Sequence, residues 1–244
     1  MRPSKRAFDQ IRQVSIQTNV NAYAEGSCLI KFGNTHVLCT ASIDEKVPHF
    51  LRGKGLGWIS AEYNMLARST HQRNSRDPMK PNGRSIEIQR LIGRSLRSVI
   101  DVRKLGERQI IIDCDVLQAD GGTRCAAITG GYVALAIAVK KIINQRIINQ
   151  NPLIGKVCAI SCGIFNGNIV ADLDYAEDSK CEVDSNFVLN QNFDLIEIQG
   201  TAENGAMSFA NISQMYELSK TAAKEIFKLQ QNAIANACGE LVEN

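Results

Sequence analysis

The segment Asp120-Gly121-Gly122-Thr123-Arg124 contains the residue types that bind a phosphate group. The two glycines permit a sharp turn, and Thr123 is a common residue at the N-cap of a helix. Backbone N–H groups at a helix start attract anions, and the guanidinium of Arg124 is a planar fork that matches phosphate oxygens. The segment has the outline of a phosphate site, although it also suits an ordinary turn between a strand and a helix. It matches neither GxxxxGK[ST] nor GxGxxG, so it does not indicate a nucleoside triphosphate or a dinucleotide.

A stripe of arginines precedes this segment. Arg90, Arg94 and Arg97 are spaced four and three residues apart, which places them on one face of a helix. Residues 68–108 carry eleven Lys and Arg against four acids, a surplus of seven, while the whole chain has a net charge of only +3. This surplus favours a polyanionic partner. The alternative is a solvated helix face on which Glu87 and Asp101 pair with the arginines.

Acidic residues gather later in the chain. Residues 170–204 contain nine acids and a single base, Lys180. Carboxylates near a phosphate site can hold a hard cation such as Mg²⁺, and one of them can act as a general acid. Phosphoryl transfer requires both phosphate-binding arginines and such carboxylates. An acidic turn between two strands is the alternative.

Regular elements must position these groups. Residues 109–117 are β-branched and apolar, which predicts a buried strand, and residues 126–139 predict a helix that ends at Lys140 and Lys141. Residues 85–102 read as an amphipathic helix that carries the arginine stripe. Further strands are expected at 157–166, 168–173, 183–189 and 195–199, followed by a helix over about 212–235.

The composition agrees with one globular domain over residues 1–244. The chain has 244 residues, of which 44% are apolar, so it can bury a sizeable core. The order of the elements predicts an α+β fold of two similar β-rich halves, each closed by helices.

The other reactive residues do not form recognisable sites. Most of the eight cysteines lie in apolar, strand-like runs, as buried thiols do, and no CxxC pair occurs. The three histidines are scattered along the chain. The absence of an apolar signal region and of an apolar run of eighteen residues speaks against a membrane span, so a reducing cytoplasm is expected.

Six ordered blocks of sequence resemble the bacterial ribonuclease PH family, almost from end to end. The blocks are Gly33-Asn34-Thr35-His36-Val37-Leu38-Cys39-Thr40-Ala41-Ser42, Gly57-Trp58-Ile59-Ser60-Ala61-Glu62-Tyr63, residues 83–97, Asp120-Gly121-Gly122-Thr123-Arg124, residues 172–184, and Glu197-Ile198-Gln199-Gly200-Thr201-Ala202-Glu203. The resemblance implies a phosphorolytic exoribonuclease, with inorganic phosphate as co-substrate, that trims the 3′ ends of tRNA precursors. It further implies a homohexamer, a trimer of dimers.

The resemblance also assigns residues to roles. It places phosphate at Arg84 and at Gly122-Thr123-Arg124, and it places proton transfer or Mg²⁺ at Asp178 and Asp184. We expect a loop with Arg68, Arg73 and Arg76 to clamp the tRNA body. The stripe of Arg90, Arg94 and Arg97 is expected to contact RNA, the site or a neighbouring subunit.

The expected reaction has two obstacles. Phosphate approaches another anion, and the arginines with a helix N-terminus offset that repulsion. The ribose 3′-oxygen is a poor leaving group unless it is protonated or bound to a metal, which Asp184, or a cation held with Asp178, can provide.

Four residues depart from the family pattern: Asn64 and Ala67 replace Gly and Pro, Ser85 replaces Thr, and Cys181 lies within the acidic block. None removes a candidate catalytic group. Two other readings stay open, a non-catalytic RNA-binding ring subunit of an exosome-like assembly and a hydrolase that uses water. Retention of Arg84, Arg124, Asp178 and Asp184 argues against the ring subunit. Dependence on inorganic phosphate distinguishes an exoribonuclease of the ribonuclease PH kind from a hydrolase.

Overall fold

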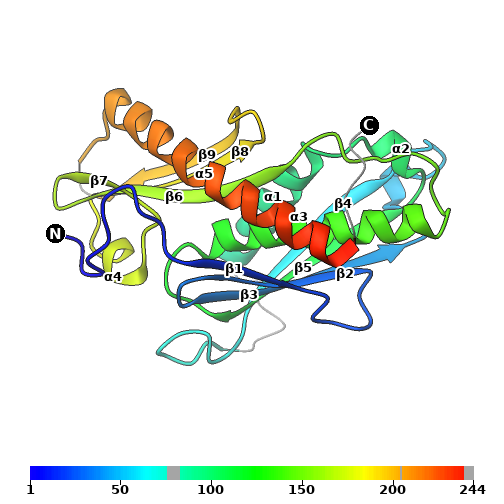
Figure 1. Ribbon diagram of the computed structural model, residues 1–244, viewed down its shortest axis with the longest axis horizontal. Helices are drawn as coiled ribbons and strands as arrows, with labels where there is room; N and C mark the ends of the chain where they lie inside the picture. Colours follow the sequence, from blue (N-terminus) through cyan, green and yellow to red (C-terminus); the bar gives the residue numbers. More distant parts are fainter. Residues whose placement is uncertain (76–82, 204, 239–244) are drawn as a thin grey trace.

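The first half of the chain builds a five-stranded sheet (Figure 1). The computed structural model describes residues 1–75, 83–203 and 205–238. In spatial order the sheet is β1-β2-β3-β5-β4, and its strands are β1 (Val14–Thr18), β2 (Gly26–Phe32), β3 (Thr35–Asp44), β5 (Gln109–Gln118) and β4 (Trp58–Met65). Neighbouring strands are antiparallel except β4 and β5, which are parallel. Parallel strands need a crossover, and this one contains α1 (Gly83–Arg97) and the short α2 (Val102–Leu105).

The second half forms a four-stranded antiparallel sheet. Its order is β7-β6-β8-β9, with β7 (Asn168–Ala171), β6 (Val157–Phe165), β8 (Val183–Asn190) and β9 (Leu195–Ala202). The one-turn helix α4 (Tyr175–Asp178) joins β7 to β8, and the long α5 (Phe209–Cys238) packs against β6 and β7. Figure 1 shows the N-terminus beside α4, although the two are far apart in the sequence.

Helix α3 (Thr123–Asn144) is the centre of the molecule. It packs against β2 and β3 of the first sheet, against β6 of the second sheet, and against α1 and α5. By length and composition alone it could cross a membrane, with a mean hydropathy of 1.6, but 83% of that window is buried inside the fold. A helix that is covered on all sides is apolar all round, which explains its composition without a membrane.

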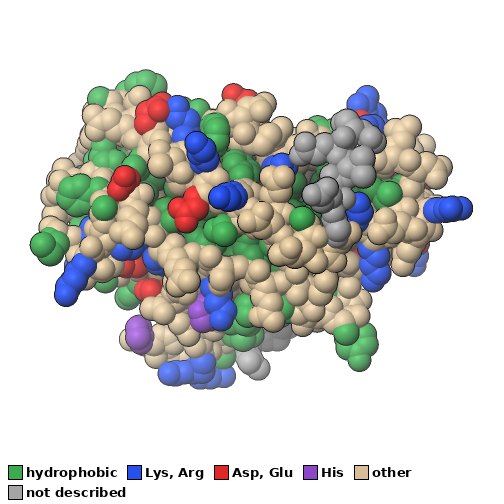
Figure 2. All heavy atoms as spheres, viewed as in Figure 1, with side chains coloured by type: hydrophobic (Ala, Val, Ile, Leu, Met, Phe, Trp, Pro, Cys, Tyr) green, Lys and Arg blue, Asp and Glu red, His purple; other side chains and the backbone are tan. Residues whose placement is uncertain are grey.

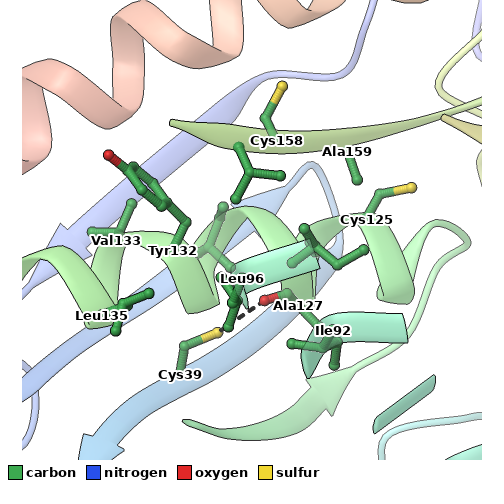
Figure 3. Close-up of a cluster of buried hydrophobic side chains, with 14 of the residues drawn as sticks. Cys39, Ile92, Leu96, Cys125, Ala127, Tyr132, Val133, Leu135, Cys158 and Ala159 are labelled. Carbon is green, nitrogen blue, oxygen red and sulfur yellow. Dashed lines mark hydrogen bonds between the residues drawn. The ribbon is translucent and has the colours of Figure 1, made fainter. Parts of the chain in front are cut away.

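The first sheet and α3 approach each other closely because small residues line the contact. A Cβ atom on Gly26 of β2 would lie 2.1 Å from the carbonyl oxygen of Ala134, and one on Gly130 would lie 2.7 Å from Cγ2 of Ile30. Figure 3 shows Cys39 of β3 directed at α3, where its thiol donates to the carbonyl oxygen of Ala127 at 3.9 Å. The buried cysteines therefore act here as small hydrophobic residues, as their apolar surroundings indicated.

One hydrophobic core joins the two halves. It includes Ile30 and Ile112 from the first sheet, Val157 and Phe187 from the second, and Ile226 from α5. The predicted α+β class, with β-rich halves each closed by helices, is confirmed.

Three local expectations need correction. Helix α1 ends at Arg97 instead of continuing to Val102, because Ile100 forms a β-bridge with Leu153 and Asp101 caps α2. Helices α3 and α5 extend further than the apolar pattern indicated, to Asn144 and Cys238. The N-cap of α3 is Gly122 and not Thr123, which is the first helical residue.

Candidate active site

A cleft of about 570 Å³ lies where the two halves meet. Residues from β4, the following loop, α1, α3, β6, α4 and β8 line it. The lining residues are Met65, Thr70, His71, Gln72, Asn74, Arg84, Ala119, Gly121, Gly122, Thr123, Arg124, Ser161, Tyr175, Asp178, Asp184 and Asn186.

Every residue that the sequence assigned to phosphate or to proton transfer lines this cleft. They are Arg84, Gly122, Thr123, Arg124, Asp178 and Asp184. They come from the start of α1, the start of α3, the end of α4 and the start of β8, four elements that span a hundred residues of sequence. The fold therefore brings the two arginines and the two carboxylates into one cavity.

The N-terminus of α3 opens into the cleft without a side-chain cap. Gly122 has φ 68° and ψ 22°, a left-handed conformation that glycine adopts at little cost, and as the N-cap residue it has no side chain that could accept a hydrogen bond from the first turn. The hydroxyl of Thr123 is occupied, since Tyr63 Oη donates to Thr123 Oγ1 at 2.9 Å. The N–H groups of the first turn thus keep their capacity to bind an anion in the cleft.

Arg124 has a buried nitrogen that needs an acceptor. Its Nη2 contacts Glu87 Oε2 at a long 3.4 Å. Its Nε is buried and has no hydrogen-bond partner among the residues that the structure describes. A buried unsatisfied donor costs free energy, about 1–3 kcal/mol, so an anion bound beside Arg124 would relieve that cost.

The pKa values of the two carboxylates in the cleft, Asp178 and Asp184, are both raised. Burial and the charge of Asp178 together raise the pKa of Asp184 to about 6, against the opposing charges of Arg124 and Arg84. The pKa of Asp178 is also raised, mainly by burial, and the same two arginines lower it. A carboxyl group with a pKa near neutrality can exchange a proton with substrate.

The same two side chains are too few to form a metal cage by themselves. Among the described residues, no group of three or more His, Cys, Asp or Glu side chains is arranged to hold a metal ion. Mg²⁺ is commonly held by one or two carboxylates together with substrate phosphates and water. Asp178 and Asp184 fit that pattern, and do not fit a cage made of protein ligands alone.

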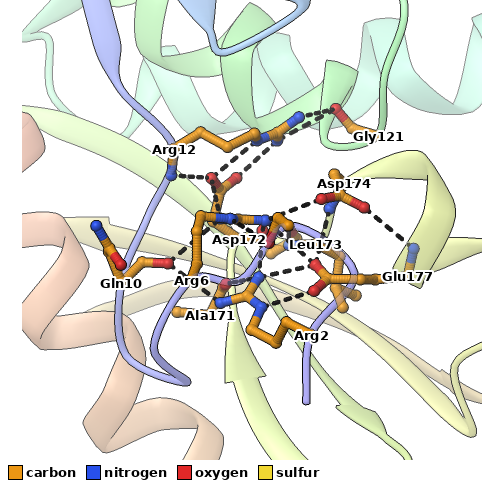
Figure 4. Close-up of polar contacts among 12 residues, drawn as sticks. Arg2, Arg6, Gln10, Arg12, Gly121, Ala171, Asp172, Leu173, Asp174 and Glu177 are labelled. Atoms are coloured by element: carbon orange, nitrogen blue, oxygen red, sulfur yellow. Dashed lines mark hydrogen bonds and ion pairs between the residues drawn. The ribbon is translucent and has the colours of Figure 1, made fainter.

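The rest of the acidic block has a structural role. Figure 4 shows Asp172, Asp174 and Glu177 bound by arginines from the first residues of the chain. Arg2 is buried, and its Nε and Nη2 donate to the two carboxylate oxygens of Glu177 at 2.6 and 2.8 Å. Arg6 reaches all three acids at 3.2–3.3 Å. These pairs fix α4, and with it Asp178, against the N-terminal segment.

The loop after β4 supplies one wall of the cleft. Asn74 closes this loop, because its N–H donates to the carbonyl oxygen of Ala67 at 2.8 Å and its side chain donates to Ser69 Oγ at 3.2 Å. Arg68 and Arg73 are exposed on it. Figure 2 shows Lys and Arg side chains, with histidine beside them, along the edge where this loop projects.

Arg76 lies outside the described residues. The clamping of RNA by the loop stays a prediction.

The three arginines of the α1 stripe have different surroundings. Arg90 is exposed, while Arg94 Nη2 pairs with Glu197 Oε1 of β9 at 2.6 Å. Arg97 lies 4.4 Å from the centre of the Trp58 ring and donates to the carbonyl oxygen of Ile59 at 2.6 Å. Arg94 therefore links the two halves, and Arg97 fastens α1 to β4. An RNA-binding role for the three arginines stays a prediction.

Sequence reasoning missed several residues of the cleft, among them Asn186, Tyr175 and Ser161. Asn186 lies two positions after Asp184 on β8, which puts both on the same face, and this spacing could have indicated it. Tyr175 was visible only as part of the acidic block, and its side chain is 56% exposed at the mouth of the cleft. Ser161 gave no signal, because its strand is apolar throughout.

Two family models match the chain in order. Domain 1 of the 3′ exoribonuclease family matches residues 10–141, and domain 2 of that family matches residues 155–222. The chain belongs to the 3′ exoribonuclease family. The two models meet between α3 and β6, which is the boundary between the two sheets.

Two relatives are similar to this chain over nearly its whole length. The Ribonuclease PH of Caulobacter vibrioides (strain NA1000 / CB15N) is 55% identical over 236 residues, which cover 96% of this chain and 99% of that protein. The Ribonuclease PH of Methylocella silvestris is 55% identical over 237 residues, 96% of this chain and 100% of that protein. The resemblance to ribonuclease PH that the sequence blocks indicated is confirmed.

Solved structures share the fold. Rice (Oryza sativa) Rrp46 superposes with a TM-score of 0.78 at 19% identity, covering 96% of this chain and all of that one. A chain of the Archaeoglobus fulgidus exosome with RNA bound to the active site gives a TM-score of 0.76 at 19% identity, covering 93% of this chain and 91% of that one. At this identity the likeness supports the ribonuclease PH-type fold of this family.

Proposed function

We propose that this protein is a phosphate-dependent 3′→5′ exoribonuclease that releases nucleoside diphosphates from RNA. The observation that carries the proposal is the pairing, in one cleft, of an anion site with a carboxyl group of raised pKa. The anion site combines the uncapped N-terminus of α3 with the Nε of Arg124, which has no hydrogen-bond partner within the part of the chain that the structure describes. The carboxyl group is Asp184. The relatives named Ribonuclease PH, at 55% identity, support the same activity.

Inorganic phosphate occupies the anion site in this mechanism. The N–H groups at Thr123 and Arg124 and the guanidinium groups of Arg84 and Arg124 surround it. They reduce the repulsion between a phosphate dianion and the phosphodiester that it attacks, and they orient the attacking oxygen. A hydrolase, whose nucleophile is water, would need groups for the phosphodiester but no site for a second, free phosphate beside it.

The bond changes balance without an external reagent. An oxygen of HPO₄²⁻ forms a bond to the phosphorus of the last phosphodiester, and the bond from that phosphorus to the penultimate ribose 3′-oxygen breaks. The proton of the attacking phosphate is the one that the 3′-oxygen gains overall. Asp184, with a pKa near 6, can pass that proton on, which makes the 3′-oxygen a better leaving group.

Mg²⁺ fits the same pair of carboxylates. Asp178 and Asp184 would hold it together with oxygens of the substrate, and the ion would supply charge to the departing 3′-oxygen.

The substrate is a tRNA precursor with a 3′ extension. The loop after β4 lines one wall of the cleft, and its exposed arginines Arg68 and Arg73 would meet the folded body of the RNA. Trimming of other RNA 3′ ends follows from the same geometry, since no described residue of the cleft forms a pocket for one particular base.

The working form is a homohexamer in the cytoplasm, a trimer of dimers. The family resemblance supports the ring, and light scattering would give a mass six times the 26.8 kDa of one chain. A non-catalytic ring subunit is the alternative. The presence of Arg84, Arg124, Asp178 and Asp184 in one cleft argues for catalysis instead.

The test is a comparison of reactions with and without inorganic phosphate. A 3′-extended tRNA, labelled at its 5′ end, is incubated with the protein and Mg²⁺, and the released nucleotides are separated. Shortening that needs phosphate and releases nucleoside diphosphates supports the proposal. Shortening without phosphate that releases nucleoside monophosphates would indicate a hydrolase, and binding without shortening would indicate the ring subunit.

A further inference from the structure

The turn that forms the phosphate site is held from behind by two side chains. Thr35, at the start of β3, donates through Oγ1 to the carbonyl oxygen of Gly121 at 2.6 Å and accepts from the N–H of Asp120 at 2.9 Å. Arg12 donates through Nη1 to the carbonyl oxygen of Asp120, and both its Nη atoms lie 3.4–3.5 Å from the carbonyl oxygen of Gly121. The carbonyl groups of Asp120 and Gly121 and the N–H of Asp120 are thus bound by side chains that do not line the cleft.

Arg12 is itself fixed in place. Its Nε and Nη2 donate to the two carboxylate oxygens of Asp172 at 2.9 and 2.7 Å, and its backbone N–H donates to the same carboxylate at 2.7 Å. Asp172 is buried, and the contact with Arg12 keeps its pKa low, so the pair is ionised at neutral pH. Figure 4 shows the Arg12 side chain extended between Asp172 and Gly121. Arg12 therefore links the second half of the chain to the phosphate turn of the first.

The turn needs such support. Gly121 and Gly122 both have positive φ values, 75° and 68°, and consecutive glycines have many other conformations available. A Cβ atom on Gly121 would lie 2.6 Å from the carbonyl oxygen of Leu173, so a bulkier residue with less freedom does not fit. The direction of the first N–H groups of α3 is therefore set by contacts of the turn, and not by the turn's own stiffness.

We propose that Thr35 and Arg12 are positioning residues that hold the Asp120–Gly122 turn in the conformation that binds phosphate. The proposal rests on the proposed function. Neither side chain lines the cleft, so neither touches phosphate or RNA. Loss of either contact should weaken the binding of phosphate and change the binding of RNA much less, because the loop after β4 is closed by its own contacts through Asn74.

Thr35 offers a matched pair of variants. Thr35→Val keeps the shape of the side chain and removes the hydroxyl, while Thr35→Ser keeps the hydroxyl. We expect Thr35→Val to raise the KM for phosphate about tenfold, the size of one lost hydrogen bond to a buried group, with the KM for RNA changed less than about twofold. Thr35→Ser should restore the KM for phosphate. An equal rise in both KM values, or a normal KM for phosphate in Thr35→Val, would overturn the proposal.

Arg12 gives a second test in case the valine variant does not fold. Arg12→Gln removes the contact with the turn, and Arg6→Gln removes an ion pair with the same Asp172 without touching the turn. We expect only Arg12→Gln to raise the KM for phosphate, while both lower the melting temperature. A rise of the same size in both variants would mean that the acidic block, and not the turn, controls phosphate binding. If the unmodified protein needs no phosphate, the proposed function fails, whereas a phosphate-dependent protein with insensitive variants refutes only the positioning role.

Discussion

At the scale of single residues, Arg124 differs from an ordinary surface arginine in having a buried donor without a partner among the described residues. That donor is Nε, and the ion pair of Arg124 with Glu87 is long. We expect Arg124→Ala to lower kcat by about 10²–10³, as the loss of one preorganised charge-stabilising donor does, and to raise the KM for phosphate. Arg84→Ala should also lower kcat and raise the KM for phosphate.

A suitable control is Arg103→Ala. Arg103 is a surface residue that pairs with Asp101, and its side chain is 79% exposed. Steady-state kinetics with varied phosphate compare the three variants. Near-normal phosphorolysis in Arg124→Ala would show that the anion site has been assigned to the wrong residues.

Asp184 leads to a prediction on activity. Asp184→Asn keeps the volume of the side chain but removes its capacity to exchange a proton or to bind Mg²⁺. We expect phosphorolysis to be abolished while the variant folds and binds phosphate, which calorimetry can measure. An active Asp184→Asn protein would mean that the reaction does not use this carboxylate.

The same residue gives a prediction on stability and pH. The pKa of Asp184 is raised from 3.8 to about 6, so its ionised form opposes folding. This cost is full above about pH 6 and vanishes below about pH 4, where the group is protonated in the folded and the unfolded protein. Asp184→Asn should therefore be more stable than the unmodified protein at pH 7.5, by about 2–3 kcal/mol. The difference should disappear towards pH 4 in denaturant titrations, and a difference that does not change with pH would contradict the assigned pKa.

Local patterns indicated the phosphate turn with Arg124 and the acidic block, whereas the resemblance to ribonuclease PH assigned Arg84, Asp178 and Asp184 to their roles. The partners of Asp172 and Glu177 could not be found in that way. Arg12 lies 160 residues from Asp172 in the sequence, and no local spacing connects them. The N-cap of α3 was misassigned for a similar reason, since the hydroxyl of Thr123 is taken by Tyr63, a residue of β4.

At the scale of elements, the loop after β4 has two possible roles. It is either a clamp for the tRNA body or an exposed segment whose charges only keep it soluble. Arg68 and Arg73 are exposed, and the loop is held by Asn74, so their removal should leave its path intact. We expect the double variant Arg68→Ala with Arg73→Ala to bind a tRNA precursor more weakly, with the salt dependence reduced by about one unit of slope per lost phosphate contact. Phosphorolysis of a short unstructured oligonucleotide should persist. Equal effects on both substrates would exclude the clamp.

The contact between β2 and α3 gives a prediction on stability. Gly26→Ala would place a methyl group 2.1 Å from a backbone oxygen of α3, which cannot move away cheaply. We expect it to lower the free energy of unfolding by about 3 kcal/mol. Gly53→Ala is the control, because its Cβ meets nothing within 4 Å and only its positive φ of 72° costs free energy, about 1 kcal/mol. Similar losses in urea titrations of the two variants would mean that the helix and the sheet can separate.

Most elements could be predicted from hydrophobic periodicity, since strands such as β5 and helices such as α3 have strong apolar patterns. The residues at which these elements end could not be predicted in this way. Helix α1 stops at Arg97, although its apolar stripe continues to Val99, because Ile100 pairs with Leu153 of a distant segment. The periodicity reports only which side chains are buried, and tertiary contacts decide where an element ends.

At the scale of the whole molecule, the site exists only because the two halves pack together. Arg84 and Arg124 come from the first half, and Asp178 and Asp184 come from the second. The links that hold the halves in register include the shared core around α3, the pair Arg94–Glu197, and the bridge from Asp172 through Arg12 to the phosphate turn. The sequence indicated two halves, but it did not contain their relative placement, which depends on long-range packing.

The central claim is that inorganic phosphate is the nucleophile, and an isotope experiment tests it most directly. The protein is incubated with a 3′-extended RNA and ³²P-labelled inorganic phosphate, and the released nucleotides are separated and counted. We predict nucleoside diphosphates that carry the label in the β position, one label for each nucleotide removed, because the attacking phosphate becomes the β-phosphate. Release of unlabelled nucleoside monophosphates at the same rate would contradict the account, since water would then be the nucleophile.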